Sequence, residues 1–89
     1  MIDDLVRMIK SVKNKIEEAL PLIDNEIQYI IRNKNQSSQT IEKILDTLLD
    51  YGQLGIGAEE FKKLNNYYAS FNPTDAKYYT DSYKELYED

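Results

Sequence analysis

From Ile2 to Ile30, apolar side chains recur at alternating intervals of three and four residues. An α-helix has 3.6 residues per turn, so this spacing places them along one side of a helix. The stripe consists of Ile2, Leu5, Ile9, Val12, Ile16, Ala19, Ile23, Ile27 and Ile30. Charged residues fill the opposite face. The pattern therefore predicts a long amphipathic helix over residues 2–32, whose stripe faces either the other helices or a second chain.

Pro21 lies within this stripe and leaves two arrangements open. Proline lacks an N–H and its ring clashes with the preceding turn, so it either kinks a helix or separates two helices. Residues 19–23 contain no glycine, asparagine or serine that would favour a loop. A single helix kinked near Pro21 is therefore favoured over a helical hairpin.

A second helix is predicted after the polar residues 33–38, with Ser37 or Ser38 as its N-cap. Its inward face consists of Ile41, Ile44, Leu45, Leu48 and Leu49. Gly52 is expected to end it in the left-handed conformation. All three glycines of the chain lie within residues 52–57, which predicts a bend with Leu54 and Ile56 turned inward.

Two further helices are predicted in the last third of the chain. The first runs over residues 58–71, and its inward face consists of Phe61, Leu64, Tyr68 and Phe71. Asn72-Pro73-Thr74-Asp75 then gives a capping residue, proline at the first helical position and an acid in the first turn. The last helix is predicted to turn Ala76, Tyr79, Tyr83 and Leu86 inward, flanked by Tyr78 and Tyr87. The expected fold is all-α: a small antiparallel bundle of three to four helices, forming one domain over residues 1–89.

The composition leaves few catalytic or ligand-binding options. The chain has no cysteine and no histidine, which removes the commonest metal ligands and the commonest general base. Asp46 and Asp50 lie four residues apart on one helix, but no histidine completes a di-metal motif. The glycine-rich residues 52–57 follow a helix rather than a strand and precede Glu59 and Glu60, so they do not resemble a phosphate-binding loop. We expect no catalytic residue, no metal and no cofactor, and an enzyme is the least favoured reading.

The formal net charge is −5, and the whole excess lies in residues 42–89. Such a surface repels phosphate backbones, so no nucleic acid is expected as a partner. Arg7, Lys10, Lys13 and Lys15 form a modest basic patch, read as a solvated helix face or a contact for self-association or anionic lipid. No apolar run is long enough for a transmembrane segment, and a cytoplasmic location is expected.

Tyrosine is the most unusual component of the sequence. Of the eight tyrosines, all except Tyr29 and Tyr51 lie between residues 67 and 87. Consecutive pairs such as Tyr78-Tyr79 cannot both face inward from one helix, so some rings should be exposed. They are either marginal core residues or part of a protein-binding surface. The candidate partner-binding residues are Tyr67, Tyr78, Tyr79, Asp81, Tyr83, Glu85 and Tyr87.

Two functional hypotheses follow from these features. The first is a small acidic interaction module that docks its tyrosine-bearing half onto a protein partner, such as one with a basic face. Its size and layout are similar to those of the helical immunity proteins of Gram-positive bacteriocins, and antitoxins or phage-type inhibitors would act in the same way. The second is a structural or assembly subunit that forms homodimers or larger oligomers through the isoleucine-rich first helix.

Overall fold

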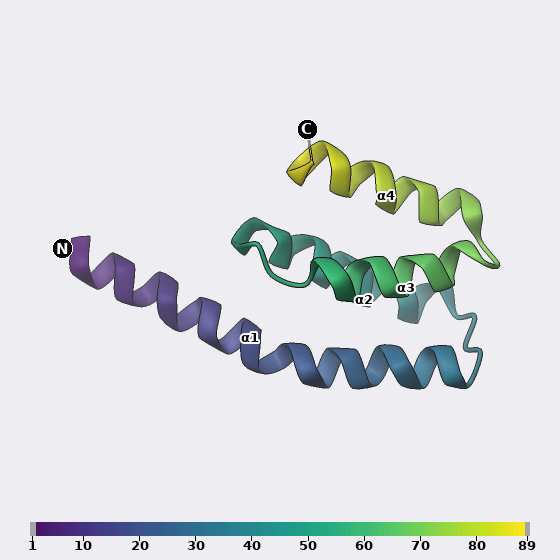
Figure 1. Cartoon of the computed structure of the whole chain (residues 1–89), viewed down its shortest axis with the longest axis horizontal. Coiled ribbons are helices and arrows are strands. Elements are labelled where there is room, and N and C mark those ends of the chain that lie inside the picture. The colour runs from purple at the N-terminus through teal and green to yellow at the C-terminus, as the bar shows by residue number, and fades with distance from the viewer. Residues whose placement is uncertain (1, 89) are drawn as a thin grey trace.

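The computed structural model describes residues 2–88, and within that range every regular element is a helix. The elements are α1 (Ile2–Arg32), α2 (Ser38–Tyr51), the short 3₁₀-helix η1 (Gly52–Leu54), α3 (Ala58–Ala69) and α4 (Pro73–Tyr87). Figure 1 shows α2, α3 and α4 gathered beside the C-terminal half of α1. The predicted all-α bundle is confirmed.

α1 is one continuous helix, and the hairpin alternative is wrong. Pro21 lies inside it on the exposed side, whereas the neighbouring Leu20 and Ile23 pack against the core. Figure 1 shows the helix changing direction partway along its length. Such a bend is the usual consequence of a proline that removes one backbone hydrogen bond without interrupting the packing on the opposite face.

The predicted helix starts are confirmed by side-chain hydrogen bonds. The Ser37 hydroxyl accepts from the Thr40 N–H at 3.3 Å, so Ser37 is the N-cap of α2. The Asn72 side chain accepts from the Asp75 N–H at 3.3 Å, with Pro73 at the start of α4. Both contacts satisfy amide groups that have no partner within their own helix.

The glycine-rich bend differs from its prediction in one respect. Gly52 does not end α2 in the left-handed conformation, because its φ of −57° continues the helical backbone into η1. The left-handed residues are Gly55, at φ 71°, and Gly57, at φ 87°. Gly52 has a packing role instead: a Cβ atom there would overlap with the ring of Tyr87.

The core lies between the C-terminal half of α1 and the three following helices. Its buried hydrophobic members are Ile27, Ile30, Ile41, Ile44, Leu45, Leu48, Ile56, Phe61, Leu64, Tyr68, Ala76, Tyr79 and Tyr83. The inward faces predicted for α2 and α3 are largely confirmed, with Leu49 and Phe71 only half-buried. A salt bridge of 3.0 Å between Lys63 Nζ and Asp24 Oδ1 also joins α3 to α1.

Two predictions for the last two helices are wrong. α3 ends at Ala69 rather than at residue 71, because the N–H groups of Ser70, Phe71 and Asn72 bond back to Tyr67 and Tyr68 in a tight turn. Leu86 is exposed rather than inward. Tyr87 takes its place, since this ring covers Gly52.

The other helices cover the stripe of α1 over only part of its length. Only Ile27 and Ile30 are buried, and Ile16, Ala19 and Ile23 are half-buried. Ile2, Leu5, Ile9 and Val12 are exposed.

Helix length explains why half of the stripe stays uncovered. At a rise of about 1.5 Å per residue, the 31 residues of α1 span about 46 Å, whereas the 14 residues of α2 span about 21 Å. The first half of α1 therefore projects beyond the bundle (Figure 1), and the molecule measures 49 × 29 × 18 Å. Its radius of gyration, 14.4 Å, exceeds the roughly 12 Å expected of a compact chain of this length.

Candidate functional site

The projecting part of α1, which we call the arm, comprises residues 2–15, all of them exposed. Six of its exposed residues are large and apolar, and we call them the arm stripe: Ile2, Leu5, Val6, Met8, Ile9 and Val12. They lie on one side of the helix at the spacing of the original stripe, with Val6 and Met8 flanking it. Their exposed fractions run from 42% at Val6 to 79% at Ile2.

The arm stripe is as large as the largest apolar patches that isolated domains commonly expose. Six aliphatic side chains exposed to this extent present on the order of 500 Å² of apolar surface, close to the largest patch on typical monomers. Patches of that size commonly mark contact sites for other macromolecules. The heptad-like spacing of the stripe was visible in the sequence, but none of its residues is among the predicted partner-binding residues.

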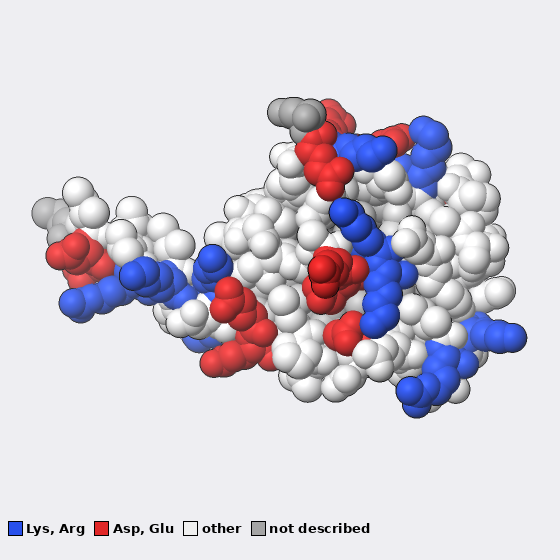
Figure 2. Space-filling view, viewed as in Figure 1, with Lys and Arg blue, Asp and Glu red and all other residues white. Residues whose placement is uncertain are grey.

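The charges of the arm follow their own order along the helix. Asp3 and Asp4 lie at its start, whereas Arg7, Lys10, Lys13 and Lys15 follow without an intervening acid. In Figure 2 the arm extends to the left, with acidic atoms near its tip and basic atoms below them and further along the arm. The arm is therefore amphipathic across its axis and electrically polarised along it.

The structure separates the predicted tyrosine surface into buried and exposed parts. Tyr79 and Tyr83 belong to the core, and Tyr67 and Tyr87 are half-buried. Tyr78 remains 68% exposed. Asp81 and Glu85 are also exposed on α4, and Asp81 pairs with Lys77 at 2.8 Å. The tyrosines thus do not form one contact surface, and only the part around Tyr78 is available to a partner.

The tyrosine hydroxyls connect helices to one another. Tyr67 donates to the Asn35 carbonyl at 2.8 Å, and Tyr87 donates to the Leu49 carbonyl at 2.7 Å. Tyr79 donates to Asp46 Oδ1 at 2.8 Å, so Asp46 has a structural partner on α4. These contacts let a polar atom sit at the edge of the core without losing its hydrogen bonds. Tyr79 and Tyr83 are both buried, so removing either ring would disturb the fold itself.

Tyr68 is the most enclosed of these residues, with an exposed fraction of 0%. Its hydroxyl donates to Glu42 Oε2 at 2.5 Å, which joins α3 to α2. The Asn72 side chain in turn donates to the Tyr68 hydroxyl at 3.3 Å. The cap of α4 is thereby attached to the centre of the bundle.

Burial shifts the ionisation of three tyrosines. Burial, and then the hydrogen bond to Glu42, raises the pKa of Tyr68 from 10.0 to about 12. Burial and the Asp46 carboxylate raise the pKa of Tyr79, and burial together with the negative charge of Glu88 raises the pKa of Tyr83. Each environment favours the protonated, neutral phenol.

These shifts predict a loss of stability at alkaline pH. Their contribution is complete below pH 10.0, the ordinary tyrosine pKa, and is lost as the pH rises, because the unfolded chain then releases protons that the folded chain retains. We expect the urea midpoint to fall progressively between about pH 10 and about pH 12. Tyr68→Phe should reduce this dependence, and an equal slope in that variant would exclude Tyr68 as a source.

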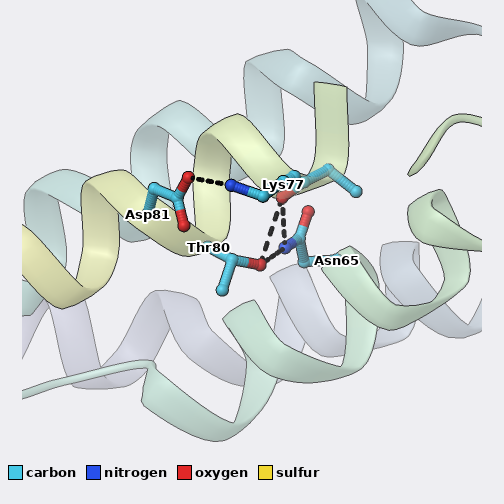
Figure 3. Close-up of polar contacts among 5 residues, drawn as sticks. Asn65, Lys77, Thr80 and Asp81 are labelled. Atoms are coloured by element: carbon cyan, nitrogen blue, oxygen red, sulfur yellow. Dashed lines mark hydrogen bonds and ion pairs between the residues drawn. The ribbon is translucent and has the colours of Figure 1, made fainter. Parts of the chain in front are cut away.

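Asn65 is the one buried polar residue among those described, with an exposed fraction of 5%. Figure 3 shows it on α3 beside Thr80 of α4. Its Nδ2 donates to the Ala76 carbonyl at 3.0 Å and to the Thr80 hydroxyl at 2.9 Å. Its Oδ1 is buried without a hydrogen-bond partner within the described residues. The two bonds fix the register of α3 against α4, which is a structural role.

The rest of the described chain offers little support for other kinds of site. Within residues 2–88, no cluster of acidic side chains has the geometry to hold a metal ion. No helix in the same range combines the length and apolarity needed to cross a bilayer. The comparisons with protein families, curated proteins and solved structures each returned no match. By its exposure and its spacing, the arm stripe is the strongest candidate functional site.

Proposed function

We propose that this chain is a protein-interaction module that docks through the arm stripe. The observation that carries the proposal is the exposure of six large apolar side chains on a helix whose remaining length is packed into a bundle. The bundle, which we call the head, comprises the C-terminal half of α1 with α2, α3 and α4. It anchors the arm at one end and leaves the stripe open along its length.

The geometry of the stripe suits a helical recognition element. Ile2, Leu5, Ile9 and Val12 repeat at three and four residues, the spacing of anchor side chains in helices that bind grooves or other helices. In such complexes the apolar anchors supply most of the affinity, and the polar face stays in solvent. The four basic residues of the arm lie beside or opposite the stripe, where they remain solvated in a docked complex.

The exposed residues around Tyr78 provide a secondary contact in this proposal. Tyr78, Asp81 and Glu85 lie on α4, in the part of the chain that holds the excess of negative charge. That charge favours approach of a basic partner surface and disfavours nucleic acid. The chain would then act by occupying a target, as immunity proteins, antitoxins and phage-type inhibitors do.

Capture from an extract of the native host tests the proposal. The tagged wild-type chain is compared with Leu5→Glu/Ile9→Glu, which places two charges on the stripe, and with Leu22→Glu. Leu22 is 71% exposed on the same helix but lies outside the stripe, so it is a matched control. We expect the stripe variant to lose proteins that the wild type and the control retain.

The same experiment can contradict the proposal or shift it to α4. If all three chains capture the same proteins, the stripe is not the docking surface. Tyr78→Ala/Asp81→Lys serves as the parallel variant for the secondary contact. Loss of capture in that variant alone would assign docking to α4.

A further inference from the structure

We propose that the arm stripe binds the arm stripe of a second copy of this chain, with the two arms antiparallel. This inference rests on the proposed function, because it names the partner of the same surface. Three observations carry it: the repeat of the stripe, the order of the charges along the arm and the amount of apolar surface exposed.

The repeat of the stripe fits pairing between equal helices. Ile2, Ile9 and Ile16 are spaced by seven residues, and Leu5 and Val12 alternate with them. This heptad arrangement lets the side chains of one helix fit between those of another helix with the same repeat. A two-fold symmetric contact of this kind needs no groove on the partner, only the same stripe.

The charge order selects the direction of the two arms. An antiparallel pair with its two-fold axis near residue 7 sets Ile2 against Val12 and Leu5 against Ile9. The acidic start of each arm, at Asp3 and Asp4, then lies level with the basic residues around Lys10 of the other. A parallel pair would instead align like charges. It would also bring the two acidic heads side by side, whereas the antiparallel pair sends them to opposite ends.

The exposed area matches what a dimer of this size needs. A stable interface buries about 800 Å² on each partner, and about 65% of that area is apolar in homodimers. The arm stripe presents on the order of 500 Å² of apolar surface, which is about 65% of 800 Å². Because the arm is exposed on all sides, a second helix can reach the stripe without any rearrangement of the head.

Analytical ultracentrifugation of the purified chain tests the inference. We expect a monomer–dimer equilibrium with substantial dimer at about 50 μM, since interfaces of similar area range from micromolar to much tighter affinities and the arm has few directional contacts to add. Leu5→Glu or Ile9→Glu should raise the dissociation constant at least ~10-fold, because each would bury a charge in the contact. The control Leu22→Glu should change it less than ~3-fold. Leu5 and Ile9 are exposed, so neither variant removes a core contact.

Two further measurements test the direction. Asp3→Lys/Asp4→Lys should weaken an antiparallel dimer, and so should Lys10→Asp/Lys13→Asp, because each change places like charges level with one another. Neither change should weaken a parallel dimer, in which like charges are level before and after the substitution. The chain has no cysteine, so Gln28→Cys on α1 accepts a single spin label. An antiparallel dimer separates the two labels by about 50 Å or more, and a parallel dimer by under about 25 Å, given the helical rise.

Other results would overturn the inference. A chain that stays strictly monomeric at about 100 μM would exclude self-association through the stripe at the affinity expected of such a contact. If capture from host extract still depended on the stripe, the proposed function would stand with a different partner. Stripe-dependent binding to phosphatidylglycerol vesicles by a monomeric chain would assign the arm to a lipid surface. A label separation under about 25 Å would reject the antiparallel arrangement.

Discussion

Tyr68→Ala is expected to lower the free energy of unfolding by about 3–5 kcal/mol, the largest effect of any single substitution considered for this chain. The ring is 0% exposed, and its removal leaves a cavity between α2 and α3. It also leaves Glu42 without the hydroxyl that donates to it. Chemical denaturation followed by far-ultraviolet circular dichroism measures the loss. If the variant is unfolded in buffer, Tyr68→Phe keeps the ring and should still lose about 1–3 kcal/mol.

Tyr78→Ala is the matched control for this substitution. Tyr78 has the same side chain on the neighbouring helix, but it is 68% exposed and donates no hydrogen bond within the described residues. We expect a change within about 0.5 kcal/mol. Equal losses at Tyr68 and Tyr78 would contradict the division of the tyrosines into core and surface.

Gly57→Ala is expected to destabilise the head by about 2–4 kcal/mol for two separate reasons. Gly57 has a φ of 87°, a conformation that side-chain-bearing residues rarely adopt. A Cβ atom there would also lie 3.1 Å from Cδ2 of Leu48, which is fully buried. The added methyl group therefore has two effects: it strains the backbone, and it crowds the buried Leu48 side chain.

Gly55→Ala separates these two causes. Gly55 also has a positive φ, 71°, but no atom lies within 4 Å of the position that its Cβ would take. Its substitution should cost about 1–2 kcal/mol, from the backbone alone. If Gly55→Ala were as costly as Gly57→Ala, the contact with Leu48 would have no measurable effect.

Most of the fold could be predicted because its determinants are local. Ser37, Asn72 and Pro73 mark helix starts through contacts within one turn, and the spacing of Ile41, Ile44 and Leu45 shows the inward face of α2 directly. Gly52 was predicted wrongly because its role depends on Tyr87, far away in the sequence. The inward position predicted for Leu86 was wrong for the same reason. The residue of α4 that covers the end of α2 is Tyr87, and this depends on how the two helices pack.

The candidate site could be predicted only in part. The stripe from Ile2 to Ile30 has one uniform periodicity, and nothing in that periodicity shows where the covering helices stop. The answer lies in the relative lengths of α1 and α2, which appear only once the helices are packed side by side. The tyrosines were misjudged for a related reason. Tyr79 and Tyr87 find acceptors at Asp46 and Leu49, on a different helix, so their hydroxyls can lie at the core margin.

The length difference between α1 and its neighbours is thus the physical origin of the proposed function. The head holds the C-terminal end of α1 by packing, and no residue of the arm belongs to the core. Its apolar residues are therefore free to bind another molecule. The polar and basic residues on the other faces of the arm keep the exposed helix hydrated while the stripe is uncovered.

Hydrogen–deuterium exchange in the arm, measured at two protein concentrations, tests the central claim most directly. At about 1 μM the amides of residues 5–12 should exchange rapidly, because a helix segment without tertiary contacts opens readily. At about 100 μM the same amides should become protected, while those of the head, such as Leu45, keep the same protection at both concentrations. Protection that is equal and strong at both concentrations would contradict the account, because the expected equilibrium leaves the stripe uncovered at about 1 μM. Rapid exchange at both concentrations would show that no second copy covers it.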